Sequence, residues 1–514
     1  MNTNSIPGYK LAGLILGVLL AVVIILGPDV GAEIALERGL PPYAPKLALA
    51  LLVWTFTWWI ASPVPLAVTA LLPGLFSSVL TGITPGALGY KDTSTAIRDI
   101  WRSYADPVII LFLGGFLLTG ILSESGLTRR IAYVLVTSRL GRVNLYFTAL
   151  MLWTACWFLS WWISNTAATA ILYPIALVLV TRIPNLSRRY QEFLLLGLAY
   201  AATAGGLATP IGTPPNLIAI KQASDIAGIS LSFTSFMILG IPTAIITLLL
   251  GYFILLAYFK PEKEMRGEII QLLEEERRKI SRITREELFA LGVFVFTITL
   301  WILRSLPDIF SSAGFAELYE NTKILKQVIP DDAVPPLLAT VIAFTMPSFV
   351  KIKPFNWEKI REWIEWDVLL IFGGGLVLGS VMLRTGFGEY ITRSIAQMFG
   401  EITPFTLLLV AGLVAFVLTQ FSSNTAVAAM TCPLVTQLGK GLFGEIVGAQ
   451  ASIISGIMAS IAFTLPISTP PNAIVFASGR IQLKNMIICG LIRGTLTLIS
   501  SLLIWLHGLP LILK

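Results

Sequence analysis

Charged residues are scarce in this chain of 514 residues. Only 13% of the residues are Asp, Glu, Lys or Arg, whereas about 25% is usual for a soluble domain. Hydrophobic residues make up 55% of the sequence, so the chain could not cover its surface with polar groups in water. The composition predicts a polytopic membrane protein. It excludes a nucleic-acid-binding protein, because the net charge of +7 follows the membrane topology and forms no basic patch.

Cysteine and histidine are also rare. Cys156, Cys432 and Cys489 lie far apart within apolar stretches, which excludes a disulfide framework and a cysteine metal cluster. The single imidazole, His507, can build neither a His-based metal site nor a His–Asp relay. No nucleophile–base pair is evident either, so we expect no enzymatic activity and no catalytic residues. The run Gly373-Gly374-Gly375 predicts close helix packing, not a nucleotide loop, and we expect no organic cofactor.

Long apolar stretches dominate the sequence, and a helix needs about 20 such residues to cross a bilayer. Two stretches, 145–181 and 404–438, are too long for one span and too short for two. Each has a polar break at its middle, Ser164-Asn165-Thr166 or Ser423-Asn424-Thr425, and we predict that each is a re-entrant hairpin. The sequence therefore predicts an all-α protein with two such hairpins and about eleven spans: 11–27, 45–61, 63–81, 107–123, 190–208, 233–259, 288–304, 334–349, 367–383, 447–465 and 486–506.

The positive charges orient these spans. With the N-terminus in the cytoplasm, 22 of the 36 Lys and Arg residues lie in segments on the cytoplasmic side and 12 lie outside, as the positive-inside rule predicts. If 145–181 crossed as one span, the basic residues of 182–189 and 260–285 would lie outside. The charges therefore favour the hairpin, a C-terminus outside and a place in the cell membrane. The polar stretch 260–287 is predicted to be a cytoplasmic linker that forms a surface helix between two halves.

The two halves repeat the same features in the same order. The triplet at 164–166 returns at 423–425, an offset of 259, and the stretch 209–216 returns at 465–472 as another Thr-Pro-Pro-Asn break, an offset of 256. Such collinearity indicates an internal duplication. Because five spans and one hairpin form each half, the second copy is predicted to be inverted in the membrane. Inverted repeats with interrupted helices are typical of secondary transporters, which bind substrate where the breaks meet.

The four breaks contain no charged side chain. Within 160–166, 209–216, 419–425 and 464–472, the polar groups are hydroxyls and amides. Helix N-termini at such breaks attract an oxyanion, while unwound carbonyl groups suit a small hard cation such as Na⁺. A dianion held by neutral groups in the membrane would be costly without co-bound cations. We therefore expect an anion site that is obligatorily coupled to sodium.

These triplets and Pro-Pro-Asn breaks resemble the motifs of the divalent anion/sodium symporter family, which carries di- and tricarboxylates, and the resemblance covers nearly the whole chain. It implies a first sodium site at Ser160, Ser164, Asn165 and Gly212, and a second at Thr419, Ser422, Asn424 and Ser468. The family often has Ala at the positions of Ser422 and Ser468. The resemblance further implies that a dicarboxylate rests on Ser164, Asn165, Thr166, Thr213, Ser423, Asn424, Thr425, Thr469 and Pro470.

The same resemblance implies a homodimer in the lipid bilayer that works as an elevator. The moving transport domain would consist of 145–259 (hairpin 145–181, broken helix 190–228) and 404–514 (hairpin 404–438, broken helix 447–480). The scaffold would consist of 11–143 and 288–400, with the amphipathic segments 127–143 and 386–400 as arms.

Two points stay open in the sequence. The leading hypothesis is sodium-coupled uptake of C4-dicarboxylates such as succinate, malate or fumarate. The alternatives keep the fold but exchange dicarboxylates without sodium, or carry sulfate or another oxyanion. Arg493 lies within the last apolar stretch, where an unpaired cation is expensive, so its side chain is expected either to reach the interface or to have a partner.

Overall fold

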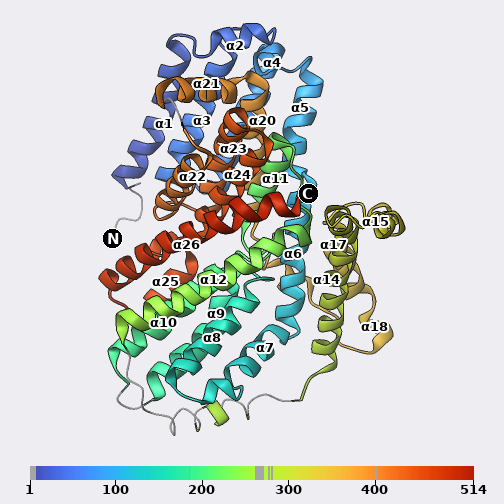
Figure 1. The fold of residues 1–514 in the computed structure, drawn as a ribbon, viewed down its shortest axis with the longest axis vertical. Coiled ribbons are helices and arrows are strands. Elements are labelled where there is room, and N and C mark those ends of the chain that lie inside the picture. Colours follow the sequence, from blue (N-terminus) through green and yellow to red (C-terminus); the bar gives the residue numbers. More distant parts are fainter. Residues whose placement is uncertain are drawn as a thin grey trace. The chain divides into compact units, whose positions relative to one another are not determined.

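The computed structural model describes residues 7–183, 186–260, 282–399 and 402–513, together with 271, 273–275 and 278. Within these residues the chain forms helices and no β-strand, as the composition predicts (Figure 1). The chain divides into two compact units, each of which combines segments from both halves of the sequence. Unit 1 comprises Met1–Ile109, Ile218–Ser230 and Trp366–Ala459, and unit 2 comprises Ile110–Leu217, Leu231–Glu365 and Ser460–Lys514.

Unit 1 contains long apolar helices joined by short ones. Its helices are α1 (Gly8–Leu26), α2 (Ala32–Glu37), α3 (Ala44–Ala61), α4 (Leu66–Ile83), α5 (Thr93–Arg102), α20 (Trp366–Thr385), α21 (Phe387–Phe399), α22 (Pro404–Thr419), α23 (Asn424–Phe443) and all but the last residue of α24 (Glu445–Ser460).

The three consecutive glycines of α20 allow this helix to approach its neighbours in unit 1 closely. A Cβ atom on Gly374 would lie 2.4 Å from the carbonyl oxygen of Ala70 in α4. One on Gly375 would lie 2.8 Å from the Cβ atom of Ala429 in α23. Since no larger residue fits at these distances, the predicted role of the glycine run in helix packing is confirmed.

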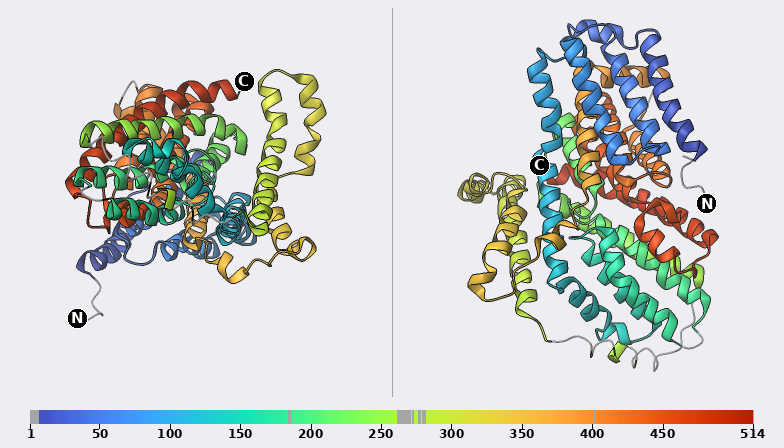
Figure 2. Two further views of the ribbon diagram at one scale, coloured as in Figure 1. Left: turned by 90° about the horizontal axis from the view of Figure 1, so that it is seen from below. Right: turned by 180° about the vertical axis from the view of Figure 1, so that it is seen from behind.

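Unit 2 is centred on α10, whose side chains are almost all buried. Helices α8, α9, α12 and α25 pack around α10, and α26 packs along α12 (Figures 1 and 2). The helices of this unit are α6 (Pro107–Glu124, from Ile110), α7 (Leu127–Val136), α8 (Leu145–Leu159), α9 (Asn165–Arg182), α10 (Arg188–Gly206), the first turn of α11 (Pro214–Gln222), α12 (Phe233–Phe259), α14 (Arg285–Ser312), α15 (Ala316–Thr322), α16 (Ile324–Val328), α17 (Val334–Thr345), α18 (Pro347–Val350), α19 (Trp357–Arg361), α25 (Pro470–Phe476) and α26 (Leu483–Ile512).

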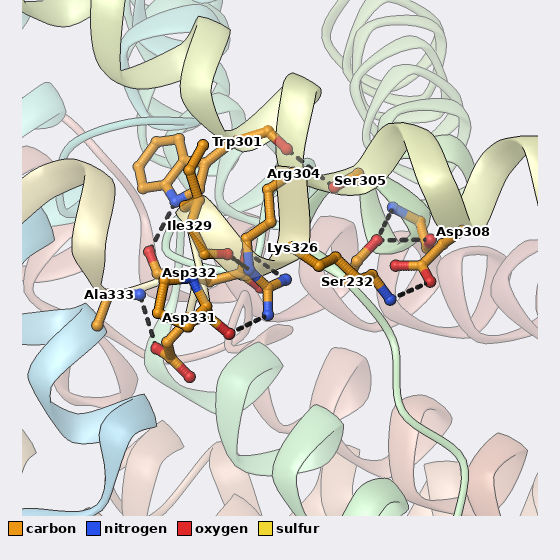
Figure 3. Close-up of polar contacts among 12 residues, drawn as sticks. Ser232, Trp301, Arg304, Ser305, Asp308, Lys326, Ile329, Asp331, Asp332 and Ala333 are labelled. Carbon is orange, nitrogen blue, oxygen red and sulfur yellow. Dashed lines mark hydrogen bonds and ion pairs between the residues drawn. The ribbon is translucent and has the colours of Figure 1, made fainter. Parts of the chain in front are cut away.

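A polar cluster fastens the end of α14 to the loop that precedes α17 (Figure 3). Arg304 donates to the carbonyl oxygen of Ile329 at 3.1 Å and pairs with a carboxylate oxygen of Asp332 at 3.0 Å. Trp301 donates to the main-chain oxygen of Asp332 at 2.8 Å, and its ring stacks on Phe233 of α12 at 4.0 Å. Burial raises the pKa of the Asp332 carboxyl, and the guanidinium of Arg304 opposes that rise. The cluster therefore joins α12, α14 and α17 within unit 2.

Eight of the eleven predicted membrane-crossing segments coincide with helices that are long and apolar enough to cross a bilayer, and 190–208, 334–349 and 447–465 do not. A ninth such helix, Asn165–Arg182, is an arm of the first predicted hairpin, so the number of crossings stays a prediction. Nine helical stretches in the described part of the chain are long and apolar enough to cross a bilayer, and α8, α17, α22 and α24 are shorter apolar helices. The predicted span 334–349 ends early, because α17 stops at Thr345 and Pro347 opens the separate helix α18. The nine stretches are Gly8–Leu26, Ala44–Ala61, Leu66–Ile83, Thr93–Glu124, Asn165–Arg182, Phe233–Phe259, Arg285–Ser311, Trp366–Thr385 and Leu483–Ile512.

Each predicted hairpin consists of two helices that pack against each other, α8 with α9 and α22 with α23. That both arms enter and leave on one side of the bilayer stays a prediction, as does the division into transport and scaffold domains. The predicted amphipathic segments 127–143 and 386–400 form α7 and α21. The predicted linker at 260–287 falls largely outside the described residues, although Glu287 at its end pairs with Arg130 at 2.8 Å.

Candidate functional site

Both hairpin tips fall at the predicted triplets. In unit 2, α8 ends at Leu159 and α9 begins at Asn165, with Ser164 as its N-cap, whose hydroxyl accepts a hydrogen bond from the amide of Ala167 at 3.3 Å. In unit 1, α22 ends at Thr419 and α23 begins at Asn424. Each tip therefore presents the N-terminal end of a long helix, where amide groups without intrahelical partners favour an anion.

The two tips repeat the same side-chain hydrogen bond. Ser160 donates to Oδ1 of Asn165 at 2.5 Å in the first hairpin. Thr419 donates to Oδ1 of Asn424 at 2.7 Å in the second, and also to the carbonyl oxygen of Ala459. A hydroxyl at the end of one arm thus fixes the amide at the start of the other. This agreement at a constant offset of 259 supports the duplication with geometry as well as with sequence.

The two unwound breaks also repeat. Between α10 and α11, the side-chain amide of Asn216 donates to the carbonyl oxygens of Gly206 at 2.9 Å and Thr209 at 2.8 Å. After α24, the amide of Asn472 donates to the carbonyl oxygens of Ala462 at 2.8 Å and Leu465 at 3.0 Å. These four carbonyl partners correspond at the offset of 256, while Asn472 also donates to the hydroxyl of Ser468 at 3.2 Å, where the first copy has Gly212. Each asparagine therefore holds its break open as a defined loop.

The sequence left open whether Asn216 and Asn472 bind a ligand or cap the helix that resumes after each break, and it did not place them among the site residues. The signal was present, since both follow a Pro-Pro pair in the two copies. What the sequence could not show is that each Nδ2 spans the break, or that each Oδ1 is buried without a hydrogen-bond partner. An unpartnered buried carbonyl oxygen in both copies is the kind of group that a cation can satisfy.

The residues predicted for the first sodium site all belong to unit 2. A Cβ atom on Gly206 would lie 2.6 Å from Oδ1 of Asn165 and 3.1 Å from the carbonyl oxygen of Gly212. The absence of a side chain at Gly206 thus brings the end of α10, the hairpin tip and the unwound loop together. Ser160 and Ser164 complete this group of uncharged oxygen atoms at the same tip. Such a set of hydroxyl, amide and carbonyl oxygens fits a small hard cation.

The residues predicted for the second sodium site are divided between the units. Thr419, Ser422 and Asn424 lie in unit 1, and Ser468 lies in unit 2. The hydroxyl of Ser422 donates to the carbonyl oxygen of Trp59 at 3.3 Å. That of Ser468 donates to the carbonyl oxygen of Leu465 at 2.7 Å. Convergence of the four residues on one ion stays a prediction.

The residues predicted to bind substrate lie at helix N-termini in both units. Thr213 and Thr469 precede the short helices α11 and α25, and both are buried. Thr213 lies 3.5 Å from the hydroxyl of Ser460, so the first unwound loop contacts the end of α24. By unit, Ser164, Asn165, Thr166, Thr213, Thr469 and Pro470 lie in unit 2, and Ser423, Asn424 and Thr425 lie in unit 1.

Known transporters resemble this chain in sequence. A family model described as "Citrate transporter" matches residues 56–451 and, in a second match, 335–513. The sodium-dependent dicarboxylate transporter SdcS of Staphylococcus saprophyticus is 29% identical over 513 residues, covering 96% of this chain and 90% of that protein. An uncharacterized transporter of Haemophilus influenzae is 33% identical over 453 residues, covering 87% of this chain and 89% of that protein.

A solved structure shares the fold. Neisseria gonorrhoeae MtrF, from a class of antimetabolite efflux pumps, matches with a TM-score of 0.57 over 88% of this chain and 96% of that chain, at 15% identity. At that identity the match bears on the fold alone. The family model covers more than half of the sequence, and its two matches together include both Ser-Asn-Thr triplets and both Pro-Pro-Asn breaks. The chain therefore belongs to the divalent anion/sodium symporter family of multi-pass membrane transporters.

Proposed function

We propose that this transporter carries C4-dicarboxylates, such as succinate, malate or fumarate, into the cell together with Na⁺. The observation that carries the proposal is the duplicated, uncharged oxygen cluster at the hairpin tips. In each copy a hydroxyl fixes the amide of an asparagine at the start of a long helix. Each tip can thus offer oxygen atoms to a cation and helix N–H groups to an anion.

The charge balance of these tips makes the coupling obligatory. No Lys, Arg or His lies in the four breaks, so a dicarboxylate would bring two negative charges into a site with no compensating side chain. Isolated charges are strongly disfavoured at such depth. Two or more sodium ions beside the diacid remove most of that cost, and the empty site without sodium holds the anion poorly. The names of the staphylococcal relatives, sodium-dependent dicarboxylate transporters, support this choice of cation and substrate.

The mechanism proposed is an elevator in a homodimer of the cell membrane, with the N-terminus in the cytoplasm and the C-terminus outside. Residues 145–259 and 404–514 would carry the ions and the diacid across as a transport domain, while 11–143 and 288–400 stay in place. The predicted inversion of the repeat favours this mechanism, because two equivalent copies of opposite orientation permit two mirror-related states of one protein.

Uptake of labelled succinate into proteoliposomes tests the function. Succinate should accumulate with an inward sodium gradient and should not accumulate when potassium replaces sodium. Equal uptake without sodium that requires unlabelled dicarboxylate inside would indicate exchange instead. If the protein takes up sulfate and unlabelled succinate does not inhibit this uptake, the substrate is sulfate and not a dicarboxylate.

The site assignment predicts that Asn165→Ala and Asn424→Ala each abolish sodium-driven uptake. Each change removes the amide that Ser160 or Thr419 holds at a hairpin tip. The matched control is Asn321→Ala, which changes an exposed asparagine of α15 and should leave uptake unchanged. Both tip variants should migrate as dimers in detergent. Wild-type uptake in either of them would remove that tip from the site.

A further inference from the structure

Arg493 is a buried cation in the membrane-crossing part of α26. It lies about 15 Å along the helix from its first residue, at 1.5 Å per residue, and only 1% of its surface is exposed. Its side chain therefore does not reach the interface. Nη2 of Arg493 donates to the main-chain oxygens of Tyr200 at 3.1 Å and Thr247 at 3.0 Å. Both partners are neutral carbonyl groups in unit 2.

No carboxylate pairs with Arg493 in the part of the chain that the structure describes, and its Nε has no acceptor. The guanidinium lies instead against two aromatic rings, 4.3 Å from the ring centre of Phe463 and 5.0 Å from that of Tyr200. Ring faces and carbonyl oxygens stabilise a cation without neutralising it. The positive charge of Arg493 is therefore uncompensated within the described residues.

The surrounding helices are shaped to hold this side chain. A Cβ atom on Gly251 of α12 would lie 2.6 Å from Cζ of Arg493, so the glycine provides the space for the guanidinium. The hydroxyl of Tyr200 donates to the carbonyl oxygens of Phe463 and Met486, both at 3.1 Å. α10, α12 and α26 thus form a preformed enclosure around the charge.

The first repeat shows that the fold does not require an arginine here. A Cβ atom on Gly240 of α12 would lie 2.9 Å from the carbonyl oxygen of Leu207, and one on Gly490 of α26 would lie 2.7 Å from that of Phe463. These equivalent contacts align α12 with α26 at an offset of 250. In this alignment Thr243 of the first repeat is the residue equivalent to Arg493. Since a threonine fills the same place in the first repeat, the charge is specific to the second.

Arg493 is connected to the second unwound break by direct contacts. Phe463, on which the guanidinium lies, follows Ala462, whose carbonyl oxygen accepts hydrogen bonds from Asn472 at 2.8 Å and Ser468 at 3.1 Å. One packed side chain therefore separates the cation from the loop that carries Ser468 and Thr469. A fixed positive charge at that place favours a nearby anion and disfavours a nearby cation.

We propose that Arg493 is a positioning residue of the transport site, which braces the loop Ile461–Thr469 through Phe463 and supplies the fixed positive charge that raises the affinity for the dianion and lowers that for sodium. The inference rests on the proposed function, since it assigns the charge to that same site. Arg493 adds one charge to a site that is otherwise built of neutral groups. The two repeats thereby differ in charge, although neither has a charged side chain in its tip or break.

The test compares Arg493→Met, which removes the charge, with Arg493→Lys, which keeps it, in proteoliposomes. KM for succinate is measured at saturating sodium, and the half-saturating sodium concentration at saturating succinate. In the Met variant we expect KM for succinate to rise between about 2-fold and 30-fold and the half-saturating sodium concentration to fall. The Lys variant should stay near the wild type in both. A merely structural role would weaken both ligands in both variants, so opposite shifts distinguish the charge effect from damage.

Three outcomes would overturn the inference: an unchanged KM for succinate in the Met variant, a rise in both constants, or equal behaviour of the Met and Lys variants. If the Met variant is not recovered in folded form, Phe463→Leu removes the ring brace and leaves the charge. It should raise KM for succinate, and an unchanged KM contradicts the positioning role. Wild-type uptake with and without sodium tests the proposed function separately. If the wild type carries sulfate instead, the same opposite shifts are expected for sulfate, and if it carries no oxyanion, both proposals fail.

Discussion

At the scale of single residues, Asn216 and Asn472 show how a broken helix is kept broken. The side-chain amide of each asparagine donates hydrogen bonds to two carbonyl oxygens of the adjacent break. The carbonyls of Gly206 and Ala462 have no intrahelical donor, because the residues four positions later, Pro210 and Pro466, lack an N–H group. A ladder of helical bonds is thereby replaced by one side chain, which fixes the loop conformation and leaves other main-chain oxygens available to ligands.

This role predicts that Asn472→Asp is severely damaging although the side chains have the same shape. A carboxylate cannot donate, so the oxygens of Ala462 and Leu465 lose this donor, keep only those of Ser468, and face a negative charge. We expect a loss of about 2–4 kcal/mol of stability, from two lost hydrogen bonds and a buried carboxylate beside two carbonyl oxygens, and no succinate uptake. Thermal unfolding in detergent measures the first and proteoliposomes the second. Asn321→Asp in exposed α15 is the control, and wild-type stability of the Asn472 variant would contradict the role.

The sequence predicted the tips and breaks because their signals are local and occur twice. Ser164 and Ser423 precede helices in both copies, and each Pro-Pro pair opens the short helix that follows a break. The carbonyl group of Gly206 and the environment of Arg493 could not be predicted in the same way. Both features depend on the packing of helices that are far apart in the sequence. No local sequence pattern predicts which carbonyl oxygen contacts which side chain.

At the scale of helices, close packing around α20 leads to a matched pair of glycine substitutions. Gly374→Ala places a Cβ atom 2.4 Å from the carbonyl oxygen of Ala70, so α4 and α20 must separate. We expect a destabilisation of about 1–3 kcal/mol from overpacking. Gly292→Ala in α14 meets nothing within 4 Å and should stabilise that helix by up to about 1 kcal/mol. Thermal unfolding of both variants decides the point, and equal melting temperatures would refute close packing at α20.

The contact between α2 and α21 depends on charge and therefore on pH. Partial burial alone would raise the pKa of Glu389, but hydrogen bonds and ion pairs with Arg38 and Arg393 lower it below its ordinary value. A lowered folded-state pKa means that the carboxylate stabilises the protein above the ordinary value of about 4.3 and loses this contribution as the pH falls through the folded-state pKa.

We therefore expect acid to affect the wild type more than Glu389→Gln. Between pH 7 and pH 3.5, the stability difference between the two proteins should shrink. The side chains are partly exposed, so the change is about 1 kcal/mol or less. Melting temperatures of both proteins at the two pH values measure it. A difference that stays constant would show that Glu389 makes no charge-dependent contribution to this contact.

At the scale of the whole molecule, the number of spans in each half determines whether the repeats are inverted. The matching contacts at offsets of 259 and 256 support a duplication, and neither contact depends on how the chain crosses the bilayer. The inversion follows from the re-entrant hairpins. If each hairpin is a single crossing instead, the two halves have the same orientation and every loop between the two hairpins changes side.

Labelling with a membrane-impermeant maleimide decides between these topologies. The native cysteines Cys156, Cys432 and Cys489 are all buried, so labelling of the wild type should be low and introduced cysteines can be read directly. Arg139→Cys precedes the first hairpin and Lys323→Cys follows it, and both positions are exposed. In intact cells the reagent should reach position 323 and should reach position 139 only after the membrane is permeabilised. Labelling of neither position in intact cells would mean that 145–181 crosses the membrane once and would remove the inverted repeat. Position 323 lies between two crossings that follow the hairpin. It is therefore outside if 145–181 returns to the side it entered, and in the cytoplasm if 145–181 crosses the membrane once.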